Sequence, residues 1–346
     1  MAIMLKNKHV FTLLVLVILI VSKSASARDQ IQIVGSSTVF PFSTAVAEQF
    51  GQKTSFKTPV VESTGSGGGL KLFCSGIGEE TPDITNASRR IKEREFNKCI
   101  QNGATPVEIK VGFDGIVMSS AKEGIVLNLT HLQIFNALAK KVVVDGELKD
   151  NPHRLWSDVD SSLPSVRIEV LGPPPTSGTR DAFVELVFEN GAKNVEMLSA
   201  IRKRDKKAFE KIAHAIREDG AYVETGENDN LIIQKIKANP SAVGILGFSF
   251  FDQNSDKIKG ASIAGIQPTF DNIASGDYPI SRSLYFYVKK EHVGIVPGIE
   301  EYISEFTNEE TWGDEGYLAE KGLIPLPKAD REIIAKKALS FEPLIM

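Results

Sequence analysis

One structural unit recurs along this chain of 346 residues and limits the folds that it can adopt. The unit is a short apolar strand, a turn of glycine and hydroxyl residues, and a helix. Residues 31–34 lead through Gly-Ser-Ser-Thr to a helix predicted over residues 43–50, whose apolar side chains share one face. A strand over residues 60–62 leads through Ser-Thr-Gly-Ser-Gly-Gly-Gly to a short helix over residues 70–74. Alternating strands and helices predict an α/β fold with mainly parallel sheets.

Two later segments repeat the unit with different turns. Residues 82–84 lead through Thr-Asn-Ala-Ser-Arg-Arg to a charged helix over residues 91–99. A strand over residues 166–171 leads through Gly-Pro-Pro-Pro-Thr-Ser-Gly-Thr-Arg to a helix over residues 181–189. In α/β folds, ligands lie outside the carboxyl ends of the strands, next to helix N-termini. All four turns therefore occupy the place where a ligand is expected.

Two longer segments have patterns of their own. Residues 107–117 predict a strand that is interrupted near residues 112–115, where two glycines occur. Residues 201–217 predict one basic amphipathic helix with an apolar stripe toward a core. Its charges indicate a solvated face in preference to a docking surface.

The first 27 residues differ from the rest of the chain. Lys6 and Lys8 precede an apolar run over residues 10–21, and Ala25 and Ala27 then form an A-x-A pattern. This pattern predicts a secretory signal peptide that is cleaved after Ala27, with an uncleaved anchor as the alternative. The run has 12 residues, whereas a membrane-spanning helix needs about 20. We therefore expect an exported, periplasmic protein, with delivery to an outer membrane leaflet as the alternative.

The net charge argues against a nucleic acid partner. Loss of residues 1–27 lowers the formal charge from -4 to -7, because that segment carries three lysines and no acidic residue. A chain this acidic has no global field that attracts nucleic acid. Binding of an anion must therefore be local.

The chain has only two cysteines, Cys74 and Cys99. An exported chain meets an oxidising compartment, so the pair predicts a disulfide, with two buried thiols as the alternative. Two cysteines without a neighbouring histidine make a poor metal site, and no metal or other cofactor is expected. The histidines after residue 27 are scattered and carry no catalytic motif: His131, His153, His214 and His292.

The small turns have the chemistry of an oxyanion cradle. A helix N-terminus presents unpaired N–H groups and about half a positive charge. Glycine lets the backbone approach an anion closely, and serine or threonine adds a hydroxyl donor. Arg89 and Arg180 add forked donors, with a structural ion pair as the alternative role for each.

Known enzyme motifs do not account for these turns. Leu70 stands where the dinucleotide-binding pattern requires its third glycine. The turn Thr-Ser-Gly-Thr-Arg lacks the Gly-Lys-Ser/Thr ending of a P-loop, and no Gly-x-Ser-x-Gly nucleophile elbow occurs. The sequence therefore predicts a binding protein and no enzyme.

Seven segments together resemble one family over nearly the whole chain after residue 27. In order they read IVGSSTVFPF, STGSGGGLKLF, DITNASRR, SGTRDAF, AVGILGFSFF, YPISRSLYFYV and GYLAEKGLIPLP. Their order and spacing resemble the periplasmic phosphate-binding proteins of the PstS type, which supply ABC importers. The resemblance implies a two-lobed periplasmic-binding-protein fold, each lobe a sheet flanked by helices, joined by two hinge strands and closing around one phosphate.

The resemblance also implies a set of phosphate-binding residues. Those that match the family's turns are Ser37, Thr38, Val39, Ser66, Ser177, Gly178 and Thr179. The chain departs from the best-known members at Ser88, where they have an aspartate that accepts the proton of hydrogen phosphate. Arg89 follows Ser88 and is a further candidate. Asp114 and Glu62 are candidates for the missing acceptor.

A second departure concerns the loop of the second lobe. The best-known members place an Arg-x-Asp pair just before Ser-Gly-Thr, where this chain has Pro173 and Pro175. Arg180, directly after the loop, is the candidate for the replacement charge. Because the acceptor is missing, a receptor for sulfate or molybdate stays open as an alternative to a phosphate receptor.

The resemblance finally implies the domain order and the partners. We expect a signal peptide over 1–27, a first lobe over 28–111 plus 278–346, and a second lobe over 112–277, with crossings near 110–111 and 279–281. The expected partners are inorganic phosphate and the permease subunits of an ABC importer, and the expected state is a monomer. Two different functions also stay open, namely an exported phosphoryl hydrolase and a sensor or adhesion protein that kept the fold and lost transport.

Overall fold

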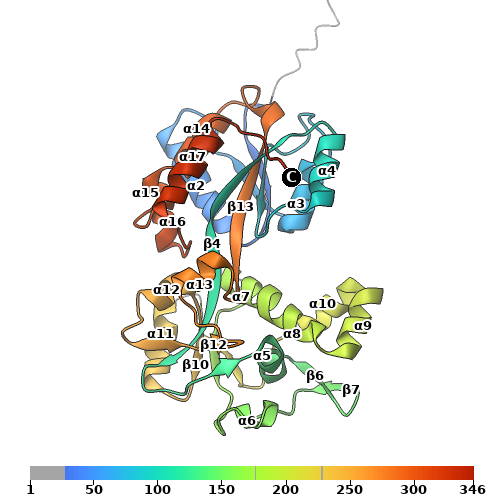
Figure 1. Cartoon of the computed structure of the whole chain (residues 1–346), viewed down its shortest axis with the longest axis vertical. Helices are drawn as coiled ribbons and strands as arrows, with labels where there is room; N and C mark the ends of the chain where they lie inside the picture. Colours follow the sequence, from blue (N-terminus) through green and yellow to red (C-terminus); the bar gives the residue numbers. More distant parts are fainter. Residues whose placement is uncertain (1–27, 176, 227–228) are drawn as a thin grey trace, which may run out of the picture.

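The computed structural model describes residues 28–175, 177–226 and 229–346, and it consists of two lobes stacked along the longest axis (Figure 1). Strands β4 (Pro106–Ala121) and β13 (Ser281–Lys289) run between the lobes. The predicted two-lobed α/β architecture is therefore confirmed. The predicted signal peptide lies outside the described residues. Among the residues that are described, no helix is long and apolar enough to cross a membrane.

The upper part of the sheet contains the first strands of the chain. Strand β1 (Gln32–Gly35) pairs in parallel with β2 (Val60–Ser63) and β3 (Ile84–Ala87). Strand β13 then pairs antiparallel with both β3 and β4. The sheet is therefore mixed and not mainly parallel as predicted, because β4 leaves the first lobe and β13 returns to it in the opposite direction.

The lower part of the sheet continues from β4. Strand β10 (Val243–Gly247) and strand β11 (Ile258–Gly260) both pair antiparallel with β4. Strand β8 (Val170–Gly172) lies between β10 and β9 (Tyr222–Glu224), parallel to both. Two small strand pairs lie outside this sheet: β5 (Asn128–Leu129) with β12 (Ser262–Ile263), and β6 (Lys141–Val144) with β7 (Glu147–Asp150).

The strand predicted to break near residues 112–115 runs on without interruption. A Cβ atom at Gly112 would meet the carbonyl oxygen of Ile324 at 2.6 Å. Phe113 and Ile324 exchange two backbone hydrogen bonds at this point, of 2.8 and 3.1 Å. The register with β13 shifts opposite Gly112, between Leu284 and Tyr285. The glycine therefore permits a close backbone approach and a bulge, and it does not end the strand.

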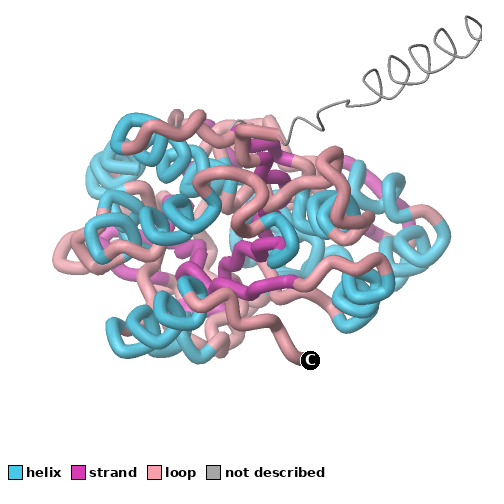
Figure 2. Tube along the Cα trace, turned by 90° about the horizontal axis from the view of Figure 1, so that it is seen from above, coloured by secondary structure: helices cyan, strands magenta, loops and turns pink. Residues whose placement is uncertain are grey.

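Helices cover both faces of the sheet (Figure 2). Those of the first lobe are α2 (Phe40–Lys53), α3 (Gly65–Phe73), α4 (Glu93–Gln101), η2 (Lys290–His292), α14 (Ile299–Phe306), α15 (Glu309–Trp312), α16 (Tyr317–Glu320) and α17 (Lys328–Leu339). Those of the second lobe are α5 (His131–Leu138), α6 (Trp156–Val159), α7 (Gly178–Phe183), η1 (Val184–Phe188), α8 (Glu189–Lys193), α9 (Glu196–Arg204), α10 (Lys206–Ala213), α11 (Asp229–Ala238), α12 (Phe248–Asp252) and α13 (Phe270–Ser275).

The prediction of one basic helix over residues 201–217 is wrong. The chain forms α9 and α10 instead, because the Asp205 carboxylate accepts a hydrogen bond of 3.0 Å from the Ala208 amide and so starts a new helix. The helix predicted over residues 181–189 begins earlier, at Gly178, and continues through a π-helical turn into α8.

The strands that cross between the lobes contribute to two large hydrophobic cores, one in each lobe. On β4, Val111 belongs to the core of the first lobe and Phe113 to the core of the second. On the return path, Ile280 belongs to the second core and Leu284 to the first. Each lobe therefore has a hydrophobic core of its own, as expected of a unit that moves as a rigid body. Ile324 and Leu326 of the returning segment also belong to the second core.

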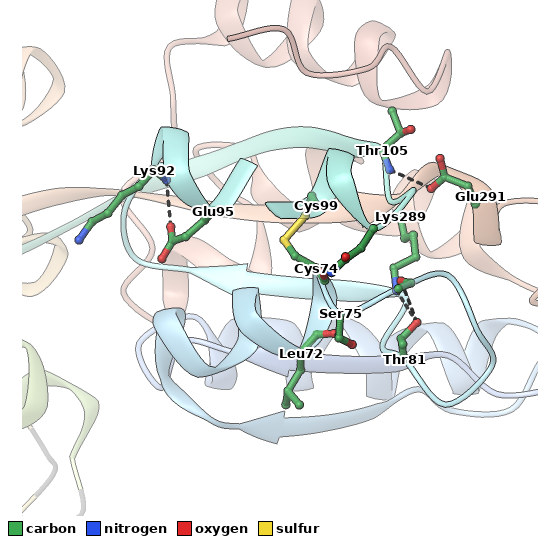
Figure 3. The surroundings of a disulfide bond; sticks show 12 residues. Leu72, Cys74, Ser75, Thr81, Lys92, Glu95, Cys99, Thr105, Lys289 and Glu291 are labelled. Carbon is green, nitrogen blue, oxygen red and sulfur yellow. Dashed lines mark hydrogen bonds between the residues drawn. A yellow bond between two sulfur atoms is a disulfide. The ribbon is translucent and has the colours of Figure 1, made fainter. Parts of the chain in front are cut away.

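The predicted Cys74–Cys99 disulfide is confirmed (Figure 3). Cys74 follows the last residue of α3, and Cys99 lies in α4. Both side chains are buried, together with Leu70 and Phe73. The bridge therefore holds α3 against α4. The prediction of a glycine turn followed by a helix over residues 70–74 is wrong, because α3 begins at Gly65 and contains the glycine stretch.

Candidate functional site

The turns after β1 and β3 and the start of α3 lie at one edge of the sheet. Their strands are parallel neighbours, so their carboxyl ends meet there. The Ser36 amide donates to the Asn86 carbonyl at 2.9 Å, which joins the first turn to β3. The Ser88 amide donates to the Ser66 hydroxyl at 3.0 Å, and the two hydroxyl oxygens lie 3.1 Å apart. The structure thus brings the predicted residues Ser66 and Ser88 into direct contact, and it joins the turn after β1 to the end of β3.

The glycine stretch allows α3 to reach this edge. A Cβ atom at Gly69 would meet the Cα atom of Gly35 at 2.5 Å and the Thr85 hydroxyl at 2.6 Å. Only glycine lets the helix backbone pack this closely on β1 and β3. Gly65 has a φ of +72° at the start of the helix, where a side chain would be strained. These contacts place Ser66 in the first turn of α3, facing Ser88.

The turn after β1 carries the hydroxyl groups of Ser37 and Thr38 next to the buried side chain of Val39. Val39 is fully buried in the core of the first lobe and stands at the start of α2. Thr38 is nearly buried, and its hydroxyl oxygen accepts a hydrogen bond from Nη2 of Arg282. Ser37, by contrast, is half-buried. The side chain of Thr38 is therefore held in place by a residue that lies far away in the sequence.

The second-lobe loop forms the first turn of α7. The Ser177 hydroxyl accepts a hydrogen bond of 3.2 Å from the Thr179 amide and so caps the helix. A Cβ atom at Gly178 would meet nothing within 4 Å, so open space adjoins this backbone. Thr176 lies outside the described residues.

Arg180 is held against its own lobe. Its Nη1 atom donates to the Pro173 carbonyl at 3.2 Å and lies 3.7 Å from a Glu224 carboxylate oxygen. Its guanidinium also stacks 4.6 Å from the ring centre of Tyr222. The ion-pair alternative for Arg180 is therefore realised in this conformation, and its role at a ligand stays a prediction.

Arg89 likewise forms a structural ion pair. Its two terminal nitrogens donate to the two Glu95 oxygens at 2.8 Å each. Burial raises the pKa of Glu95, but the bonds from Arg89 and from the Lys92 amide bring that pKa below its ordinary value. The guanidinium is thus directed to the start of α4, and the structure does not bring it together with the other predicted side chains.

Arg282 is the residue at this site that the sequence did not reveal. Its Nε atom donates to Asp114 at 3.2 Å, its Nη1 atom to Glu185 at 2.6 Å, and its Nη2 atom to the Thr38 hydroxyl. The Arg282 side chain is only 9% exposed. One guanidinium thus connects the first-lobe turn, a crossing strand and the helix that follows the second-lobe loop. The available signal was a lone arginine in the strand segment YPISRSLYFYV.

Carboxylates surround this guanidinium. Asp114, a predicted acceptor candidate, pairs with Arg282, whereas Glu62 is exposed on β2. Burial and the neighbouring Glu185 raise the pKa of Asp181, although Arg282, His214 and Arg180 act in the opposite direction. The site therefore combines hydroxyl and amide donors, one buried cation and several carboxylate acceptors.

Comparison with known proteins gives concordant results. A family model described as a PBP superfamily domain matches residues 21–310. Protein SphX of Synechococcus elongatus is 28% identical over 89% of this chain and 80% of its own length. Phosphate-binding protein PstS of Staphylococcus haemolyticus is 30% identical over 82% of this chain and 79% of its own length.

Solved structures agree with the fold. The crystal structure of a possible phosphate binding protein from Planctomyces limnophilus has a TM-score of 0.70 and 29% identity, over 92% of this chain and 100% of that one. PstS from Borrelia burgdorferi has a TM-score of 0.56 and 19% identity, over 87% of this chain and 100% of that one. The second likeness supports the fold alone.

Proposed function

This chain belongs to the PBP superfamily, and from that premise we propose that it captures inorganic phosphate between its two lobes and delivers it to an ABC importer. Relatives named phosphate-binding protein PstS and the Planctomyces limnophilus structure support the choice of phosphate. The family consists of solute-binding proteins, and we propose binding without catalysis.

The observation that carries the proposal is the position of Arg282. A guanidinium binds a tetrahedral oxyanion well because its donors form a planar fork. Here that fork is buried and touches Thr38 of the first lobe and Glu185 of the second. An anion bound at Arg282 would therefore reach the hydroxyl and amide donors of both lobes. The proposed donors are those of Ser37, Thr38, Val39, Ser66, Ser88, Ser177, Gly178 and Thr179.

The carboxylates favour phosphate over sulfate. Hydrogen phosphate carries a proton that a carboxylate can accept, whereas sulfate is fully ionised and is repelled by a carboxylate. Asp114 contacts Arg282, and the carboxylate of Asp181 interacts electrostatically with the same guanidinium. These side chains replace the aspartate that is absent at Ser88.

Lobe boundaries form part of the proposal. We propose a first lobe over residues 28–111 plus 278–346 and a second lobe over residues 112–277, with closure around β4 and β13. The change of hydrophobic core between Val111 and Phe113 supports the first crossing. On the return path the change falls between Ile280 and Leu284, a few residues after the proposed start of the returning segment.

We further propose that the protein is exported by residues 1–27, acts as a monomer, uses no cofactor and binds no nucleic acid. The acidic charge supports the last point.

Calorimetric titration of the phosphate-stripped protein with inorganic phosphate tests the function. We expect saturable binding, weaker competition by sulfate, and a loss of about 1.5–3 kcal/mol of binding free energy in Arg282→Ala, the scale of a charged hydrogen bond. Arg204→Ala, on the exposed end of α9, is the matched control and should bind like the native protein. A native protein that gives no heat with phosphate, or an Arg282→Ala variant with native affinity, contradicts the proposal.

A further inference from the structure

Two carboxylates share the guanidinium of Arg282, and they come from different parts of the fold. Asp114 lies directly across from Arg282 in the register of β4 and β13. Glu185 lies in η1, the helical segment that follows the Ser-Gly-Thr loop of the second lobe. The two acids therefore have different relations to any movement of the lobes.

Asp114 is fixed to Arg282 by the strand pairing. Backbone pairing of β4 with β13 extends from Ser281 to Lys289, so the two residues stay neighbours when the lobes rotate. The Asp114 carboxylate accepts a hydrogen bond from Nε of Arg282. The two terminal nitrogens of the guanidinium have other partners, Glu185 and Thr38. Its position suits a residue that orients the arginine.

Glu185 has no such fixed relation. Its carboxylate contacts Nη1 of Arg282 at 2.6 Å, while its own side chain is 46% exposed. The adjoining Val184 and Val187 belong to the core of the second lobe, whereas Thr38, on Nη2 of the same guanidinium, lies beside Val39 of the first. The contact thus spans the two lobes and can exchange with solvent.

We propose that Glu185 is an internal competitor of the ligand: its carboxylate occupies Nη1 of Arg282 until an incoming phosphate displaces it. This inference rests on the proposed phosphate function. A carboxylate and a phosphate both offer oxygen atoms that accept charge-assisted hydrogen bonds from a guanidinium, so they can compete for the same nitrogen. The exchange costs the Glu185–Arg282 contact, so Glu185 lowers the affinity for phosphate. The same contact holds the lobes together while no ligand is bound.

The two acids therefore have opposite predicted effects. An ion pair with one partner about half exposed is weak, so Glu185→Gln and Glu185→Ala should bind phosphate about two- to fivefold more tightly than the native protein. Asp114→Asn should bind phosphate more weakly, because the guanidinium loses its orienting partner. Glu196→Gln, on α9 of the same lobe, is the charge-matched control and should equal the native protein.

Titration calorimetry with inorganic phosphate and small-angle scattering of the ligand-free proteins test the inference. We expect tighter binding and a larger radius of gyration in both Glu185 variants, with Asp114→Asn shifted toward weaker binding. If native protein binds phosphate and the Glu185 variants bind it equally or more weakly, the inference is overturned while the proposed function stands. If native protein and all variants fail to bind phosphate, the proposed function falls, and this inference with it.

Discussion

Removal of the Cys74–Cys99 disulfide should destabilise one lobe and leave the other unchanged. The bridge closes a loop over a sequence separation of 25 residues. For a loop of that length, the entropy that the bridge removes from the unfolded chain corresponds to about 3.5 kcal/mol. Both cysteines lie inside the first lobe, between α3 and α4. We therefore expect Cys74→Ala/Cys99→Ala to lower the free energy of unfolding of that lobe by about this amount.

The chain offers a fluorescence reporter for each lobe. It has two tryptophans, and Trp312 is buried in the core of the first lobe whereas Trp156 is buried in that of the second. Urea unfolding of the double cysteine variant in a Trp156→Phe background reports the first lobe. The same variant in a Trp312→Phe background reports the second. Each result is compared with the disulfide-intact protein of the same background.

The expected result is a transition at lower urea concentration for the first lobe only. The slope of that transition should also increase, because an unfolded chain without the cross-link exposes more surface. A loss below about 1 kcal/mol in the Trp156→Phe background would show that the bridge does not act through the unfolded chain as reasoned. An equal loss in both backgrounds would show that the lobes do not unfold as separate units.

Two further predictions concern packing and pH. Gly69→Ala should destabilise the protein by about 1–3 kcal/mol and weaken phosphate binding, because its Cβ atom would meet the Gly35 backbone at 2.5 Å. Gly67→Ala is the control, because a Cβ atom there would meet nothing within 4 Å. Equal melting temperatures of the two variants would refute the packing argument. Burial lowers the pKa of Lys289 from 10.5 to about 8. Between pH 8 and pH 10.5 the Lys289 amine is therefore protonated in the unfolded chain and largely neutral in the folded protein. The free energy of unfolding should rise by up to about 3 kcal/mol from pH 8 to pH 10.5, and urea titrations of Lys289→Met should lack this rise.

The sequence predicted the local parts of the fold well, because their signals are local. The starts of α2 and α7 follow from glycine, hydroxyl and proline residues within a few positions of each helix start. The glycine stretch predicted as a turn instead forms the first part of α3, because Gly69 packs closely on β1 and β3. The Cys74–Cys99 bridge followed from the compartment and from the count of cysteines. The break at Asp205 was missed because a single capping side chain overrode a continuous apolar stripe.

Arg282 could not be predicted as a site residue from local pattern. Its contact with Thr38 joins residues 244 positions apart, and its contact with Glu185 joins residues 97 positions apart. Only the pairing of β13 with β4, and the return of the chain to the first lobe, bring these groups together. For the same reason, nothing near Arg180 in the sequence identified Glu224, on β9, as its partner. Glu95 lies only six positions after Arg89, but several other carboxylates and cations are equally close in that segment, so the sequence did not single out the pair.

The position of β13 has a consequence for the order in which the molecule assembles. This strand lies between β3 and β4, although it follows the whole second lobe in the chain. Because the polypeptide is synthesised from its N-terminus, one edge of β3 stays unpaired until the chain has been made as far as residue 289. The first lobe to be synthesised is therefore the last to be completed, and chains truncated before Ser281 should expose an unpaired strand and self-associate.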